Sequence, residues 1–111
     1  MDGIEMLRVL GNEYNPQILS FAHEPRSAQE FSDELDVPIA TCYRRIDELQ
    51  EADLLEHHDR VLSDERRRVN VYRRNIEEVV VDFSDGDISV EVEERRRVKN
   101  QIDEVWRTLS E

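Results

Sequence analysis

One segment, residues 35–55 with the sequence LDVPIATCYRRIDELQEADLL, constrains the fold more than any other part of the chain. Cys42, Ile46 and Leu49 recur there at i, i+4 and i+7. This spacing places the three side chains on one face of a helix, so that they can pack onto a core. Pro38 suits the first turn of such a helix, because the amide hydrogen that proline lacks would have no partner there.

A second helical pattern precedes this segment. Ser27 and Glu30 have the spacing of a capping box, and Phe31 and Leu35 face inward in the helix that follows. The link of a few residues up to Pro38 is the short turn that lets two helices cross steeply, as in a helix-turn-helix. The second helix of such a unit places its N-terminal residues on base edges. An ordinary amphipathic helix with solvated arginines is the alternative.

Two shorter helical patterns lie nearer the N-terminus. The first covers residues 4–10, and Gly11 can end it. The second begins after Asn15, which can cap it, with Pro16 in its first position.

Strand patterns follow residue 55. Residues 55–62 and 68–73 can be strands, and the polar SDERR between them suits a turn. A hairpin directly after a recognition helix is the wing of a winged helix. A second hairpin is predicted in VVVDFSDGDISVEVE, where Asp85-Gly86 favours a two-residue type I′ loop. Its register would place six side chains on one face: Phe83 opposite Ile88, Val81 opposite Val90 and Val79 opposite Val92.

A helical period returns from Glu94 to the end of the chain. Its apolar seam is narrow and can lie on its own domain or pair with a second copy, of which we favour pairing. We therefore predict an α+β, mainly α fold: a winged helix-turn-helix at residues 1–75, and a β-hairpin with a C-terminal helix at 76–111 as a dimerisation extension of the same domain. The predicted dimer contacts are Ile4, Leu7, Val98, Ile102, Val105, Trp106 and Leu109.

The charge is strongly negative but unevenly distributed. The net charge is −12, and all but one of the 15 basic residues are Arg, the exception being Lys99. Such a surface is similar to those of halophilic archaeal proteins and indicates a salt-rich cytoplasm, with an ordinary acidic protein as the alternative. Residues 44–74 hold equal numbers of Arg and of acids, so a DNA-facing surface would have to lie in this neutral window.

Residues 4–75 resemble the ArsR-like winged helix-turn-helix transcriptional regulators, and among them the haloarchaeal members. The resemblance rests on Leu10-Gly11, the serine-led helix at 27–35, the turn at 36–38 and the passage Ala52-Asp53-Leu54-Leu55, where Asp53 replaces a frequent glycine. It implies DNA contacts from the helix-turn-helix and from the wing. These are Ser27, Pro38, Ile39, Ala40, Thr41, Tyr43, Arg44 and Arg45, and Arg66, Arg67 and Arg68.

The metal ligands of sensing members are missing. Residues 31–35 contain no Cys and residues 94–111 no His, so we expect neither a metal nor another cofactor. His57 and His58 are adjacent on a predicted strand and point to opposite faces, which hinders a shared metal. Cys42 is a possible redox residue, but its core position favours an inert thiol.

No catalytic site is expected either. The chain has no nucleophile with a base and an orienting group, and no glycine-rich phosphate loop with Lys. No apolar run approaches the roughly 18 residues of a spanning helix, and the N-terminus lacks an apolar signal core. We expect a cytoplasmic protein without a membrane partner.

The predicted function is a homodimeric, sequence-specific transcriptional regulator that binds a pseudo-palindromic site in double-stranded DNA, with transcription machinery as a further partner. Two alternatives remain open. One is a winged-helix module for protein–protein interaction, and the other is a thiol- or ligand-gated sensor.

Overall fold

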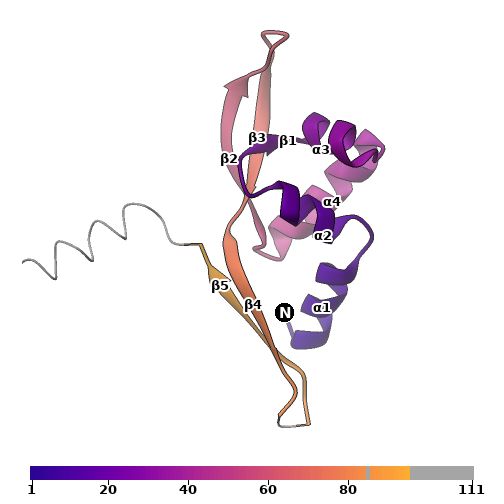
Figure 1. Ribbon diagram of the computed structural model, residues 1–111, viewed down its shortest axis with the longest axis vertical. Coiled ribbons are helices and arrows are strands. Elements are labelled where there is room, and N and C mark those ends of the chain that lie inside the picture. The colour runs from indigo at the N-terminus through magenta and orange to yellow at the C-terminus, as the bar shows by residue number, and fades with distance from the viewer. Residues whose placement is uncertain (85, 96–111) are drawn as a thin grey trace, which may run out of the picture.

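The computed structural model describes residues 1–84 and 86–95. In this part of the chain, helices α1 (Gly3–Gly11), α2 (Asn15–Phe21), α3 (Ala28–Leu35) and α4 (Ile39–Glu51) lie beside two antiparallel sheets (Figure 1). One sheet contains β1 (Arg26–Ser27), β2 (Leu55–Leu62) and β3 (Arg68–Arg74), and the other contains β4 (Ile76–Asp82) and β5 (Ser89–Glu94). The architecture is α+β, as the sequence predicted.

The turn between α3 and α4 is held by local hydrogen bonds. The predicted capping box is confirmed: Ser27 Oγ accepts from the amide of Glu30, and Glu30 Oε1 accepts from the amide of Ser27, both at 3.1 Å. At the other end of α3, Asp36 is left-handed with φ 54°, and Ser32 Oγ donates to the carbonyl of Val37 at 2.5 Å. Pro38 is the residue before α4 and not its first helical residue.

The core lies where α4 crosses α3. The predicted inward face of α4, Cys42, Ile46 and Leu49, is fully buried. Phe31 of α3 is buried with it and meets the Phe21 ring edge-on, with 5.9 Å between the ring centroids. Full burial of a large apolar side chain such as Phe31, Ile46 or Leu49 contributes about 1.5–3 kcal/mol, so these residues stabilise the packing of α3 on α4. The core cluster comprises Ile18, Leu19, Ala22, Ala28, Phe31, Val37, Cys42, Ile46, Leu49, Ala52, Leu54, Leu55, Tyr72 and Ile76.

The first hairpin, β2 with β3, forms the wing. The predicted strands are confirmed, and β3 continues one residue further than expected. The short strand β1 pairs with the other edge of β3, aligning Arg26 with Tyr72, so that the start of the helix-turn-helix is joined to the base of the wing. The turn is closed by the amide of Ser63, which donates to the carbonyl of Arg67 at 2.7 Å.

The second hairpin, β4 with β5, aligns Val79 with Val92 and Val81 with Val90. Hydrogen-bonded pairing ends at Asp82 and Ser89, so Phe83 lies beyond the ladder and is 66% exposed, not on a buried face as expected. Gly86 adopts φ 80°, while Asp85 lies outside the described residues and the predicted loop type stays a prediction. The N-terminus of α1 lies so close to this hairpin that a Cβ on Gly3 would collide with the carbonyl oxygen of Ile88. Only glycine fits at this position.

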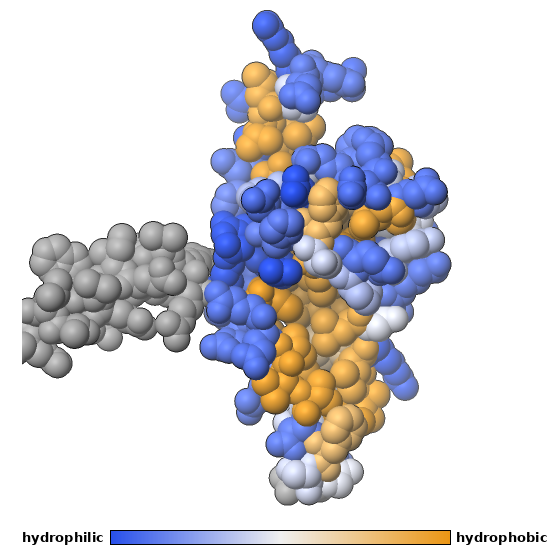
Figure 2. All heavy atoms as spheres, in the orientation of Figure 1, coloured by the Kyte–Doolittle hydropathy of each residue, from blue (hydrophilic) through white to orange (hydrophobic). Residues whose placement is uncertain are grey.

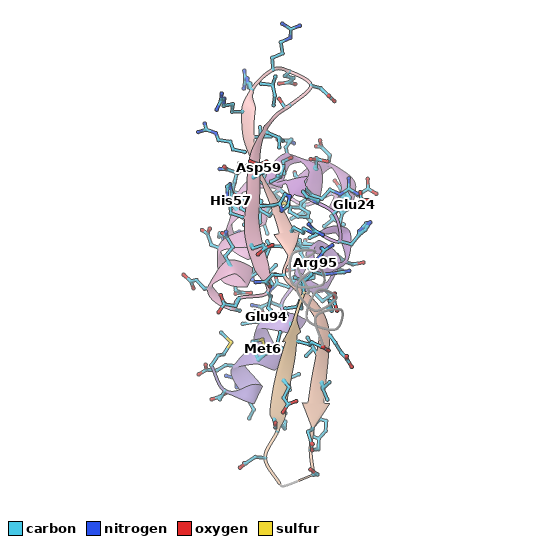
Figure 3. The ribbon with its side chains drawn as sticks, turned by 90° about the vertical axis from the view of Figure 1, so that its left-hand side faces the viewer. Met6, Glu24, His57, Asp59, Glu94 and Arg95 are labelled. Carbon is cyan, nitrogen blue, oxygen red and sulfur yellow. The ribbon has the colours of Figure 1, made fainter. Side chains whose placement is uncertain are left out.

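Two arginines, one at the end of β3 and one directly after β5, join the strands to the end of α2 and to the turn that follows it. The amide of Arg74 donates to the carbonyl of Ala22 at 3.0 Å, and its Nη1 donates to that of Leu19 at 3.2 Å. Arg95 Nη1 donates to the carbonyl of His23 at 3.5 Å, at the base of the hairpin (Figure 3). The last carbonyls of a helix have no partner within it, so Arg74 satisfies carbonyls at the end of α2. Arg95 joins the end of the second hairpin to the turn after α2.

The predicted C-terminal helix lies outside the described residues and stays a prediction, together with its seam of Val98, Ile102, Val105, Trp106 and Leu109. Among the helices that the structure describes, none has the length and apolar character needed to cross a membrane.

Candidate nucleic-acid interface

Burial of one side of α4 determines which residues it presents outward. Since Cys42, Ile46 and Leu49 face the core, the opposite side of the first turns is exposed. Tyr43 is 52% exposed and Ile39 is 38% exposed. The exposed residues at this end of the helix-turn-helix are Pro38, Ile39, Ala40, Tyr43, Arg44 and Asp47, and Thr41 is half-buried among them. Apart from Asp47, all were predicted to contact DNA.

Arg44 is the freely presented cation of this face. Its Nη2 donates to Thr41 Oγ1 at 3.0 Å, and the structure shows no ion pair for it with any carboxylate among the described residues. A guanidinium in this state keeps most of its donors free for a planar acceptor such as the guanine edge.

Arg45, the next residue, is held inside the protein. Its Nη1 lies 3.4 Å from Glu48 Oε1, and both side chains are about three-quarters covered. The sequence predicted the same role for Arg44 and Arg45, but their positions differ because consecutive helical residues point about 100° apart. Arg45 acts in this structure as a partner of Glu48.

Glu48 is the centre of a polar hub that joins the N-terminal helices to α4. Asn12 Nδ2 donates to both carboxylate oxygens at 2.9 and 3.0 Å, and Asn15 Nδ2 donates to Oε1 at 2.5 Å. Asn15 is fully buried and also donates to the carbonyl of Val9 at 2.6 Å. The sequence predicted Asn15 as the cap of α2, which was wrong: the cap position belongs to Tyr14, which adopts φ 71° and makes no capping hydrogen bond.

Ser27 is placed differently from the other predicted contacts. It is 6% exposed, and its hydroxyl is occupied by the capping box of α3. Its structural role is therefore to begin the first helix of the helix-turn-helix.

The tip of the wing carries three consecutive exposed arginines, Arg66, Arg67 and Arg68. Arg66 adopts the left-handed conformation with φ 60°, in which its amide donates to the carbonyl of Ser63 at 2.8 Å. This conformation costs a residue with a side chain about 1–2 kcal/mol, and glycine would adopt it freely. The wing thus has an arginine at a turn position whose backbone conformation favours glycine.

Cys42 and the histidines of the wing offer little reactive chemistry. Burial raises the pKa of the Cys42 thiol, whose Sγ lies 3.8 Å from the carbonyl of Val37, so the reactive thiolate is disfavoured. His57 lies on β2 of the wing (Figure 3). Its Nε2 is 3.0 Å from Asn70 Oδ1, and its ring meets that of Tyr72 edge-on. No group of three or more His, Cys, Asp or Glu among the described residues could hold a metal ion.

Comparison with known families agrees with this geometry. Residues 18–58 match the family model of a helix-turn-helix domain. The match begins inside α2 and ends in β2, so it covers α3, the turn and all of α4. A search of curated proteins found no match. The matched domain supports a family of helix-turn-helix DNA-binding regulators, and the ArsR-like and haloarchaeal assignments remain predictions.

The sequence missed two residues of this region. Asp47 is not among the predicted DNA contacts, although it lies four residues after Tyr43 and three after Arg44, the spacing of one helical face. Glu48 gave no signal of its own, because its partners Asn12 and Asn15 are distant in sequence.

We expect Glu48→Ala to destabilise the protein. The substitution leaves the donors of Asn12, Asn15 and Arg45 without their shared acceptor, and removal of such a charged partner costs about 1–3 kcal/mol. Urea unfolding at fixed salt measures the change. Asp47→Ala, the exposed neighbour, is the control and should change the unfolding free energy by less than about 0.5 kcal/mol. Equal effects of the two substitutions would contradict the stabilising role of the hydrogen bonds to Glu48.

Proposed function

We propose that this chain is a sequence-specific DNA-binding transcriptional regulator that acts as a homodimer in a high-salt cytoplasm. The observation that carries the proposal is the outward face at the start of α4, which combines exposed apolar and aromatic side chains with an unpaired guanidinium. The helix-turn-helix match over the same residues supports it. Regulation would follow from blocking or recruiting the transcription machinery.

In the proposed complex, α4 enters the major groove by its N-terminal turns. Arg44 contacts a guanine edge, and Ile39 and Ala40 contact thymine methyl groups. The arginines at the wing tip, residues 66–68, contact phosphates or the narrow minor groove of an A·T tract. A dimer with two such units would bind a pseudo-palindromic operator with half-sites about one helical turn apart.

The proposed dimer interface is the apolar surface formed by α1 and the second hairpin. Helix α1 has no buried residue, although Ile4, Leu7 and three further apolar side chains belong to it, and Ile4 is 51% exposed. Figure 2 shows that apolar side chains gather over α1, β4 and β5 on this side of the molecule. The predicted C-terminal helix carries an apolar seam that starts at Val98. This seam has the composition to cover such a surface.

The first prediction concerns DNA binding. Arg44→Ala should lower the affinity for the selected operator by roughly tenfold or more, because a bidentate Arg–guanine pair contributes about 1–3 kcal/mol of discrimination. Fluorescence anisotropy with operator and scrambled duplexes gives both affinities. Arg60→Ala removes the same charge from an exposed position on β2, outside the proposed base contacts and the proposed dimer interface, and should leave the preference for the operator unchanged. Absence of any sequence preference in the unmodified protein would instead favour a module for protein–protein interaction.

The second prediction concerns salt. Phosphate contacts release counterions, so an ordinary repressor loses affinity steeply as salt rises. With 27 acidic residues, this chain can bind cations between its carboxylates and the phosphates, and we expect log K against log salt to be shallow or to rise. A titration of operator binding across the molar range of KCl measures the slope. A slope as steeply negative as that of an ordinary repressor would overturn this part of the proposal.

The third prediction concerns assembly. Sedimentation equilibrium should give about twice the chain mass of 13.2 kDa, and Ile4→Glu should shift the mass toward a single chain by placing a charge in the interface. Leu62→Glu, at a comparably exposed apolar position on the wing, should leave the dimer intact. A single-chain mass for the unmodified protein would contradict the proposed homodimer.

A further inference from the structure

The exposed face of α4 carries a carboxylate as well as a guanidinium. Asp47 is exposed and has no hydrogen-bond or ion-pair partner among the described residues. It follows Arg44 by three residues and Tyr43 by four, so its side chain shares the outward face of α4 with theirs. The carboxylate therefore lies on the face of α4 that carries the proposed DNA contacts.

Asp47 and Arg44 do not neutralise each other. Residues three apart on a helix often form an ion pair. Here Arg44 Nη2 instead donates to Thr41 Oγ1, on the N-terminal side and away from Asp47, and no ion pair between Arg44 and Asp47 is present. Both charges remain available to an outside partner.

A carboxylate on a DNA-facing surface has a specific consequence. Phosphates repel it, so it lowers affinity unless a base offers a hydrogen-bond donor. In the major groove, an Asp carboxylate fits the exocyclic amino group of cytosine. At about 1 M salt the Debye length is roughly 3 Å, so repulsion from phosphates is screened while a hydrogen bond at contact distance persists. High salt thus favours a carboxylate as a reader of bases.

Building on the function proposed above, we propose that Asp47 accepts a hydrogen bond from the amino group of a cytosine in the major groove and thereby determines the base at one position of each half-site. Three helical residues span about 4.5 Å along the axis, and successive base pairs are about 3.4 Å apart. The cytosine therefore lies one or two base pairs from the guanine that Arg44 contacts.

The test is selection of duplexes from a random pool in molar KCl, with the full-length protein and three variants. The unmodified protein should select a C·G pair at the position read by Asp47. Asp47→Ala should reduce the preference for cytosine at that position by roughly tenfold, and Asp47→Asn should move it toward adenine, whose N6 and N7 an Asn amide pairs with. Glu51→Gln, which removes a negative charge from an exposed site one turn further along α4, should keep the cytosine.

The outcomes separate this inference from the proposed function. If the unmodified protein selects a site and both Asp47 variants select the same site, the inference is overturned and the regulator stands. Equal gains in affinity from Asp47→Ala and Glu51→Gln, with no change of sequence, would also overturn it, since only general charge repulsion would then be at work. If the folded, unmodified protein selects no duplex, the regulator itself fails and the inference fails with it.

Discussion

The rotation of α4 about its own axis is the constraint on which the rest of the interface depends. Cys42, Ile46 and Leu49 are completely buried, and a rotation by one residue would bring them toward water at a cost of several kcal/mol. Glu48 opposes the same rotation through its hydrogen bonds to Asn12, at the end of α1, and to Asn15, the first residue of α2. The outward direction of Arg44 follows from this packing, because Arg44 is two residues from both Cys42 and Ile46 and therefore lies about 200° around the helix from each of them.

The arginines divide into two groups by their contacts. Arg45 pairs with Glu48, while Arg26, Arg74 and Arg95 donate to carbonyls at the end of α2 and in the turn after it. These four stabilise the fold and join its parts, which suits a guanidinium with five donors better than an ammonium. Within residues 44–74, Arg45 and Arg74 are bound to protein partners, so the charge balance of this window overstates the number of available positive charges.

The second hairpin connects assembly with recognition in physical terms. Arg95, directly after β5, donates to the carbonyl of His23 in the turn after α2, and Ile88, just before β5, lies against the start of α1. Helix α1 is in turn linked to α4 through Asn12 and Glu48. A second copy bound to α1 and the hairpin would therefore contact elements that are joined to the recognition helix by hydrogen bonds. In such a dimer, these bonds would set the relative orientation of the two recognition helices.

The sequence by itself determined the elements whose signals are local. The periodicity of Cys42, Ile46 and Leu49 gave the buried face of α4, and the spacing of Ser27 and Glu30 gave the start of α3. Only the tertiary structure decided which polar side chains remain free. Asn15 bonds Glu48 instead of capping α2, Arg45 turns inward while Arg44 stays outward, and Asp47 is left without a partner among the described residues. The physical reason is that hydrogen-bond partners distant in sequence compete for each charged group, and this competition has no local pattern.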